Sequence, residues 1–208
     1  MDQYIASHID PEPADLHALY RRTHLTRLYP RMCSGHVQGR ILKMLAMMIR
    51  PSRVLELGTF SGYSALCLAE GMAPGSQLHT VEIDDEAEDA LRETFAASPY
   101  GDRITLHIGD ALQVIERLKG EWDLVFIDAN KRNYVDYYRL VRPRMSRGGY
   151  IIADNTLWDG KVTDPGAHDA QTEGIRAFND LVAADTSVEK VILPLRDGLT
   201  IIRCKETD

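Results

Sequence analysis

The sequence predicts an α/β fold in which a mostly parallel sheet carries helices on both faces. Short runs rich in valine, isoleucine and leucine alternate with longer segments of helical periodicity, which is the pattern of successive strand–helix–strand units. The last two apolar runs are separated by a short turn containing Asp197-Gly198, so the last strand is expected to be antiparallel. A chain of 208 residues suits a single domain, residues 1–208.

Seven segments have the short, apolar and β-branched composition of buried strands. They are Arg53–Leu57, Gln77–Ile83, Ile104–Ile108, Trp122–Ile127, Tyr150–Ala153, Val188–Leu193 and Leu199–Arg203. A helix is expected after each of the first five, because apolar residues recur there at helical spacing. These helices are Tyr63–Glu70, Glu86–Ala97, Ala111–Leu118, Tyr134–Met145 and Gly174–Ala184.

Two further helical stretches, Ala14–Leu28 and Val37–Ile49, precede the first strand and are extra to the sheet. We therefore expect residues 1–50 to form an N-terminal helical region and residues 51–208 to form the core. Ligands of open α/β sheets bind beyond the carboxyl ends of the strands, so functional residues are expected at those ends.

Charge and composition weigh against several classes of protein. The net charge of −7 disfavours a broad nucleic-acid surface. Arg21, Arg22, Arg27 and Arg31 do cluster, but a solvated helix face is the commoner explanation of such a cluster. No stretch approaches the ~20 apolar residues of a membrane span, and the polar start lacks the apolar centre of a secretory signal. The three cysteines lack metal-site spacing and are expected to be reduced thiols in a cytoplasmic protein.

The ends of the first three strands indicate a nucleoside ligand without phosphates. Gly58 and Gly62 lie in a strand-to-helix turn, where glycine lets a ligand approach the backbone. Their G-x-x-x-G spacing differs from the dinucleotide fingerprint and from the phosphate loop. Glu82 ends the second strand, where a carboxylate can accept both ribose hydroxyls, although helix capping is a competing role. Asp110 can likewise cap the following helix or receive an adenine amine.

The fourth and fifth strands end in residues that can hold a metal ion. Asp128 follows the fourth strand, Lys131 comes three residues later, and the fifth strand ends in Asp154-Asn155. Because these strands are expected to be neighbours, two carboxylates and an amide can converge, and crowded carboxylates need a cation between them. Oxygen ligands without His or Cys favour Mg²⁺, or Mn²⁺ or Ca²⁺, over zinc. Capping of a following turn is the alternative role for Asp154-Asn155.

Six motifs together resemble the cation-dependent O-methyltransferases, class I S-adenosylmethionine enzymes that include the catechol and caffeoyl-CoA O-methyltransferases. The motifs are ELGTFSGYSALCLAE, VEID, GDAL, FIDANKRNYVDYY, GGYIIADNTLWDGKV and LPLRDGLTIIR. The resemblance begins near Met32, continues to the end of the chain, and is greatest to the caffeoyl-CoA type and its bacterial relatives. It implies a Rossmann-like seven-stranded sheet and a homodimer.

The resemblance also implies roles for individual residues. Asp128, Asp154 and Asn155 match the metal ligands, and Lys131 matches the base of the catechol enzyme, with Asp128 beside it in the reaction. The cofactor S-adenosylmethionine is expected at the following residues: Met32, Ser34, Glu56, Gly58, Ser64, Glu82, Ile83, Asp110, Ala111, Asp128 and Asn130.

The substrate is expected to contact Trp158, Asp159 and Lys131. Core packing is the alternative role of Trp158, whose large ring serves either purpose. Asp159 replaces a substrate-contacting asparagine of the plant enzymes, and Asn130 stands where they have an acid. The change at Asp159, together with SGHVQG where the plant enzymes have TSADEG, weighs against caffeoyl-CoA itself as the substrate. Residues 1–50 are expected to contribute to substrate choice and to the dimer contact.

The activity implied is transfer of a methyl group from S-adenosylmethionine to one hydroxyl of a vicinal dihydroxy aromatic compound, such as catechol or caffeate. A divalent cation would favour ionisation of the phenol, whose pKa is otherwise near ~10. Methylation of hydroxyuridine in tRNA, which some bacterial relatives perform, is the alternative, with the N-terminal arginines as its contact. A non-catalytic module is disfavoured, because it would not need the metal set and Lys131.

Overall fold

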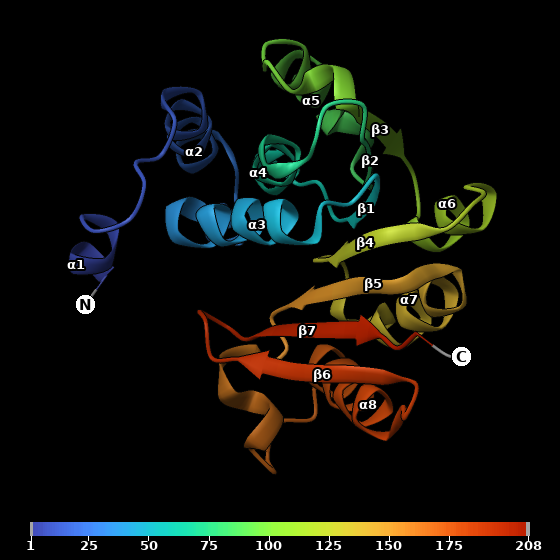
Figure 1. Ribbon diagram of the computed structural model, residues 1–208. Helices are drawn as coiled ribbons and strands as arrows, with labels where there is room; N and C mark the ends of the chain where they lie inside the picture. The colour runs from blue at the N-terminus through green and yellow to red at the C-terminus, as the bar shows by residue number, and fades with distance from the viewer. Residues whose placement is uncertain (1, 207–208) are drawn as a thin grey trace.

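The computed structural model describes residues 2–206 and contains one seven-stranded sheet in the order β3-β2-β1-β4-β5-β7-β6 (Figure 1). The strands are β1 (Arg53–Leu57), β2 (Gln77–Glu82), β3 (Ile104–Ile108), β4 (Trp122–Ile127), β5 (Met145–Asp154), β6 (Val188–Leu193) and β7 (Leu199–Cys204). β1 to β5 pair in parallel, whereas β7 is antiparallel to both β5 and β6. The predicted α/β class and the antiparallel last strand are confirmed.

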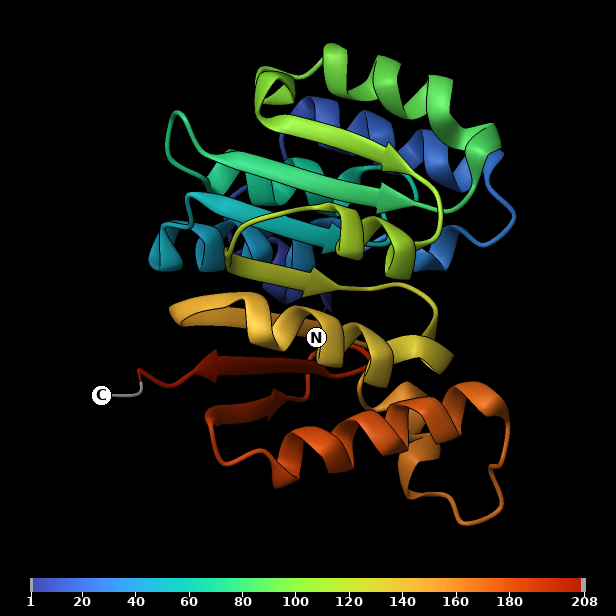
Figure 2. The same ribbon diagram turned by 90° about the vertical axis from the view of Figure 1, so that its right-hand side faces the viewer.

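Helices cover both faces of the sheet, as the sequence predicts. They are α1 (Asp2–Ala6), α2 (Ala14–Thr26), α3 (Gly35–Ile49), α4 (Tyr63–Gly71), α5 (Glu88–Ala96), α6 (Ala111–Arg117), α7 (Tyr134–Val141) and α8 (Ala170–Ala184). The helices α6, α7 and α8 share one buried cluster with the sheet and α2 to α5 share the other. Figure 2 views the sheet from the side that α6, α7 and α8 cover.

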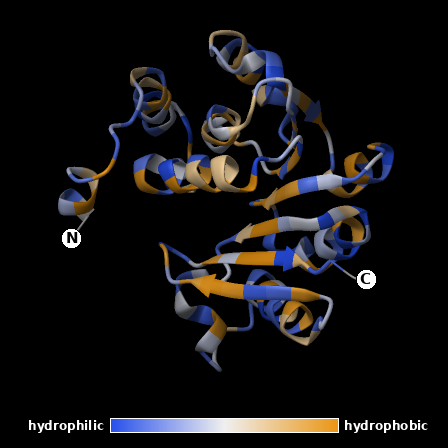
Figure 3. Ribbon diagram, in the orientation of Figure 1, coloured by the Kyte–Doolittle hydropathy of each residue, from blue (hydrophilic) through white to orange (hydrophobic). Residues whose placement is uncertain are grey.

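The two buried clusters arise because neighbouring residues of a strand point to opposite faces of the sheet. In β1, Leu55 and Leu57 belong to the cluster under α6 to α8, and Val54 belongs to the cluster under α2 to α5. Figure 3 shows hydrophobic residues gathered along the strands, whereas the helices mix hydrophobic and hydrophilic residues. None of the helices formed by residues 2–206 is both long enough and apolar enough to cross a membrane.

The structure corrects the predicted boundaries around β5. The helix expected over Tyr134–Met145 ends at Val141, because Pro143 in the following 3₁₀ turn has no backbone N–H to continue the helical hydrogen bonds. The chain then enters β5 at Met145 rather than at Tyr150. The extra residues are accommodated by an irregular register between Trp122 and Leu124 of β4.

The last helix also begins earlier than predicted, at Ala170 instead of Gly174. Asp169 caps it, since the Asp169 carboxylate accepts hydrogen bonds from the Thr172 backbone N–H at 3.0 Å and from the Thr172 hydroxyl at 2.6 Å. Near the N-terminus, the helix expected over Ala14–Leu28 ends at Thr26 instead. These shifts leave the order of the elements unchanged.

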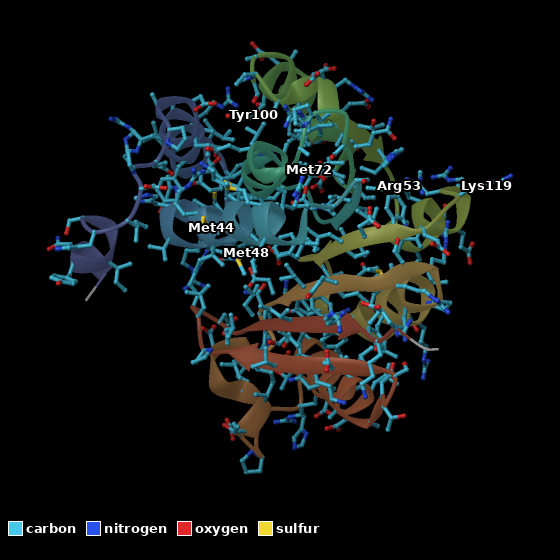
Figure 4. All side chains as sticks on the ribbon, in the orientation of Figure 1. Met44, Met48, Arg53, Met72, Tyr100 and Lys119 are labelled. Atoms are coloured by element: carbon cyan, nitrogen blue, oxygen red, sulfur yellow. The ribbon has the colours of Figure 1, made fainter. Side chains whose placement is uncertain are left out.

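A pair of partly buried histidines lies on the neighbouring strands β2 and β3. The rings of His79 on β2 and His107 on β3 stack at 5.2 Å, with Nδ1 and Nε2 3.0 Å apart. The edge of Trp122 packs on His79, and the Arg53 guanidinium lies 4.0 Å from the Trp122 ring centroid. Figure 4 labels Arg53 and Lys119, which lie on this side of the molecule. Burial, His107 and Arg53 lower the pKa of His79 to about 4.

We expect the protein to lose stability as the pH falls from 6.5 towards 4. In this window the unfolded chain protonates this histidine and the folded chain does not, so acid favours unfolding. His79→Gln should reduce the loss of unfolding free energy between pH 7 and pH 5 by about 1 kcal/mol, a figure that allows for the partial exposure of His79. Urea unfolding at both pH values measures the slope, and His24→Gln, at an exposed histidine, is the control. An unchanged slope in His79→Gln would refute the assignment.

Candidate active site

The end of β4 carries a carboxylate that is paired with a lysine. The Asp128 backbone N–H donates to the Leu57 carbonyl at 2.8 Å, which fixes the end of β4 against the end of β1. Lys131 Nζ lies 2.7 Å from Asp128 Oδ1 and 5.2 Å from the Tyr134 ring centroid. Lys131 is 8% exposed, so its ammonium group is held in place by a carboxylate and an aromatic ring rather than by water.

The end of β5 lies beside the end of β4, as expected. Asp154 is buried, and its two carboxylate oxygens accept hydrogen bonds from Gln38 Nε2 at 2.6 Å and from the Asn155 backbone N–H at 2.8 Å. The Tyr134 hydroxyl donates to the carbonyls of Ile127 at 3.2 Å and Asp154 at 3.0 Å, so one side chain joins the two strand ends.

The charges of the two carboxylates act on each other. Burial first, and then the charge of Asp128, raise the pKa of Asp154 to about 6, while its hydrogen bonds to Gln38 and Asn155 act in the opposite direction. Two carboxylates and the Asn155 amide are hard oxygen donors of the kind that Mg²⁺, Mn²⁺ or Ca²⁺ prefers. These residues therefore fit a divalent cation. Within residues 2–206 no group of three His, Cys, Asp or Glu side chains is arranged around a metal position.

A cavity opens beside Asp128 at the end of β1. Five residues that the sequence assigned to the cofactor line it together: Met32, Ser34, Gly58, Ser64 and Asp128. The other lining residues are Cys33, Thr59, Phe60, Ser61 and Tyr63. The cavity thus draws one wall from the N-terminal region and the other from the turn between β1 and α4.

Packing against the end of β4 requires a glycine at position 58, which the sequence alone does not show. Its φ is +98°, and a Cβ at this position would lie 2.0 Å from the Asp128 carbonyl oxygen. The space beside Gly58 is therefore filled by the backbone at the end of β4, in addition to any ligand that approaches the turn. Gly62, with φ of +82°, is similarly crowded by the Phe95 ring at 2.8 Å.

Glu82 and Asp110, the two acids after β2 and β3, both bind backbone amides. The Glu82 carboxylate accepts from the N–H groups of Phe60 at 2.6 Å, Ile83 at 3.0 Å and Asp84 at 3.0 Å. Asp110 caps α6 through the Leu112 N–H at 2.7 Å. The capping role weighed for Asp110 is therefore present, whereas the 3₁₀ helix after β2 is capped by Asp84 and not by Glu82. Neither residue borders the cavity beside Asp128, and the same holds for two other predicted cofactor residues, the exposed Ile83 and the buried Ala111.

Glu56 is fully buried under the cavity turn. Burial raises the pKa of its carboxyl to about 8, while hydrogen bonds from Ser64 and Thr80 act in the opposite direction. The Thr80 hydroxyl donates to Oε2 at 2.5 Å, and Oε1 has no partner among the described residues. Glu56 is therefore mainly protonated at pH 7, which fits a neutral hydrogen-bonding role. Asn130, the remaining predicted cofactor residue, is exposed and caps a 3₁₀ turn through the Arg132 N–H at 3.3 Å.

The two predicted substrate residues after β5 differ in their surroundings. Trp158 packs, partly buried, on the cluster under α6 to α8, which is the packing role weighed in the sequence. Its indole N–H is buried without a partner among the described residues. Asp159 is exposed, and its backbone N–H donates to the Asp197 carboxylate. Both residues have positive φ, 49° and 50°, so they form a sharp bend at the edge of the site.

Three functional candidates escaped the sequence analysis: Gln38, Arg196 and Asp197. Gln38 holds the Asp154 carboxylate from α3, and the other two come from the turn between β6 and β7. From the sequence, this turn indicates only that the last strand reverses direction. The sequence does offer one signal: Arg196 occupies a tight turn where glycine is the usual residue. In the structure its φ is 48°, in the left-handed region.

Two of the four N-terminal arginines contact other side chains within residues 2–206. The Arg22 guanidinium donates to the Thr94 hydroxyl at 2.6 Å, and Arg27 lies 3.4 Å from the Asp84 carboxylate. Arg21 and Arg31 are exposed. Half of the predicted cluster is therefore engaged with the protein itself.

The chain is similar along most of its length to known O-methyltransferases. Residues 6–205 match the model of a family described as O-methyltransferase. Catechol O-methyltransferase of Niastella koreensis is 32% identical over 163 residues, which cover 76% of this chain and 73% of that protein. Caffeoyl-CoA O-methyltransferase 1 of Eucalyptus globulus is 29% identical over 218 residues, 89% of this chain and 88% of its own. The crystal structure of the O-methyltransferase from Bacillus cereus in complex with SAH has a TM-score of 0.91 at 30% identity, covering 98% of this chain and 96% of its own.

We expect Gly58→Ala to destabilise the protein much more than Gly75→Ala. Both glycines have positive φ, but a Cβ at Gly75 meets nothing within 4 Å, whereas one at Gly58 meets the Asp128 backbone. Backbone strain alone costs about 1 kcal/mol, and displacing backbone in a packed site adds about 2 kcal/mol or more. Denaturant unfolding of the two variants measures the difference. Equal losses would show that the close approach to Asp128 is not a constraint.

Proposed function

The chain belongs to the O-methyltransferase family, and we propose its function on that basis. We propose that it transfers a methyl group from S-adenosylmethionine to one hydroxyl of a vicinal dihydroxy aromatic compound. The observation that carries this proposal is the Asp128–Lys131 pair, which stands next to Asp154 and on the border of the cavity at the end of β1. The chain's similarity to a catechol and a caffeoyl-CoA O-methyltransferase supports the acceptor class.

Methyl transfer from a sulfonium requires an ionised acceptor near the methyl carbon. A phenol has a pKa near ~10 and is mostly protonated at neutral pH, so its proton must be removed. Lys131 Nζ can receive that proton once it is a neutral amine, a form that a divalent cation beside it would favour, and Asp128 would stabilise the resulting ammonium. The phenolate oxygen then bonds to the methyl carbon while the carbon–sulfur bond breaks and its electrons return to sulfur. A divalent cation held by Asp128, Asp154 and Asn155 would supply positive charge that favours the phenolate.

The cofactor is proposed to occupy the cavity beside Gly58 and Ser64, with its ribose towards Glu82. Glu82 already accepts three amide hydrogen bonds, two at Oε1 and one at Oε2. A carboxylate oxygen can accept more than one hydrogen bond, so Oε2 retains capacity for a hydroxyl donor. The likeness to the Bacillus cereus O-methyltransferase in complex with SAH supports this placement.

Residues 1–50 are proposed to contribute to the acceptor pocket and to a homodimer contact in a cytoplasmic enzyme. This region exposes large apolar side chains that a partner subunit would cover. They are Tyr4, Ile5, Leu25, Leu28, Tyr29, Met32, Met44, Met47 and Met48, of which Met44 and Met48 are labelled on α3 in Figure 4. Light scattering of the purified protein measures the oligomeric state directly.

With caffeic acid as acceptor, we expect methylated product in the presence of S-adenosylmethionine and Mg²⁺ and its loss with excess EDTA. The reason is that two neighbouring carboxylates need a cation before they can hold an ionised phenol beside them. Mass spectrometry detects the product, and added Mg²⁺ should restore it. Product that persists in EDTA would contradict the metal requirement. No product in either tube, with measurable cofactor binding, would contradict the acceptor class and direct the search to hydroxyuridine in tRNA.

We expect Lys131→Ala to lower kcat with caffeic acid by about 10² to 10⁴, the usual contribution of a general base. Lys119→Ala is the matched control, because Lys119 is exposed on the opposite side of the molecule (Figure 4). Calorimetric titration with S-adenosylhomocysteine checks that the variant still binds its cofactor product. Turnover equal to that of the unmodified protein at saturating acceptor would remove Lys131 from the role of base.

A further inference from the structure

The turn between β6 and β7, residues 195–198, reaches across to the N-terminal region. The guanidinium of Arg196 donates to Gln38 Oε1 at 2.8 Å and to three backbone carbonyls of the segment before α3. These carbonyls belong to Arg31 at 3.1 Å, Cys33 at 3.3 Å and Ser34. Residues 32–34 line the cofactor cavity, so one arginine fixes that wall of the cavity to the last hairpin of the sheet.

Arg196 also determines how Gln38 is oriented. Arginine has only donors, so the Gln38 amide must turn its oxygen towards the guanidinium. Its NH₂ group then faces the other way and donates to Asp154 Oδ2 at 2.6 Å. Gln38 is 1% exposed, so water cannot replace either partner. A chain of two hydrogen bonds therefore runs from Arg196 to a candidate metal ligand.

Asp197, the next residue of the turn, binds the residues that follow β5. The Asp197 carboxylate accepts from Asn155 Nδ2 at 3.5 Å and from the Asp159 backbone N–H. Since a carboxylate only accepts, the NH₂ group of Asn155 faces Asp197, which leaves its oxygen turned away from the turn. The Asp197 carbonyl accepts from the Leu157 N–H at 2.8 Å and the Gly198 carbonyl from the Thr156 N–H at 3.1 Å, so the turn is fixed to residues 156–157.

We propose that Arg196 and Asp197 are positioning residues that align the metal ligands with the cofactor wall. Arg196, through Gln38, holds the Asp154 carboxylate, and Asp197 holds the Asn155 amide. Arg196 also holds residues 31–34 closed over the cavity. Loss of the Arg196 guanidinium therefore loosens the cofactor wall and the ligand set together. This inference deepens the proposed methyltransferase function and depends on it for the identity of the two ligands.

The backbone of Arg196 supports a side-chain role. Its φ of 48° lies in the left-handed region, where a residue with a Cβ is strained by about 1 kcal/mol and glycine is not. Arg196→Gly therefore relieves the backbone while it removes the guanidinium. A loss of function in this variant comes from the missing hydrogen bonds and not from a distorted turn.

Arg50→Gly provides a matched control. Arg50 also has positive φ, 55°, at the end of α3, and it is exposed. Its side chain makes no hydrogen bond or ion pair with residues 2–206. The two substitutions therefore remove the same charge and relieve the same kind of backbone strain. Arg196→Lys is a third variant, because an ammonium cannot match the fork of an arginine that reaches four acceptors.

The test measures hydrogen exchange of residues 31–38 in the ligand-free protein, together with Kd values for S-adenosylhomocysteine and for Mn²⁺. In Arg196→Gly we expect exchange to rise at least tenfold in this segment and both Kd values to rise about tenfold. Arg196→Lys should fall in between, and Arg50→Gly should behave like the unmodified protein. Calorimetry gives the first Kd and electron paramagnetic resonance the second.

Unchanged exchange in Arg196→Gly would overturn the proposal, as would increased exchange with both affinities unchanged. A loss of only one affinity would overturn the claim that the ligand set and the cofactor wall are aligned together. If the unmodified protein binds neither S-adenosylhomocysteine nor Mn²⁺, the proposed function fails. The exchange measurement then still decides whether Arg196 holds residues 31–38.

Discussion

Two carboxylates, Asp128 and Asp154, are held close together at the ends of neighbouring strands, and their mutual repulsion shapes the residues around them. Each carboxylate has acquired its own donor: a lysine ammonium for Asp128, and a side-chain amide and a backbone N–H for Asp154. The Tyr134 hydroxyl joins the two strand ends, so they cannot move apart to relieve the repulsion. The negative charges of Asp128 and Asp154 therefore stay close together, as expected of a site that accommodates a cation.

Sequence reasoning succeeded wherever chemistry follows the order of the chain. β1, β3 and β4 have the predicted bounds because their apolar runs are bordered by polar residues. The expectation that the residues after the fourth and fifth strands lie close together depends on those strands being neighbours, and β4 does pair with β5. The error at β5 was avoidable, because Pro143 within the expected helix already indicated a break.

The rest could not be read from the sequence because it depends on contacts between distant parts of the chain. Gln38 lies 116 residues from Asp154 and 158 residues from Arg196, and no periodicity or motif links them. The reason for Gly58 is similar in kind. A strand-to-helix turn predicts a glycine, but only the packed sheet shows that the Asp128 carbonyl fills the space beside it. Side-chain orientation and close backbone approach are properties of the assembled fold.

The reversed direction of β7 lets a short hairpin follow β6, where a parallel strand would need a long crossover connection. β6 runs towards the carboxyl edge and β7 runs back from it, so the hairpin between them opens at that edge. Its stem is fixed by a ladder that extends from Val188 opposite Cys204 to Leu193 opposite Leu199. Changes at the tip therefore alter the site without shifting the register of any strand. Evolution or design can therefore vary the length and sequence of this tip without refolding the sheet, although Arg196 and Asp197 are tied to the strand ends beside it.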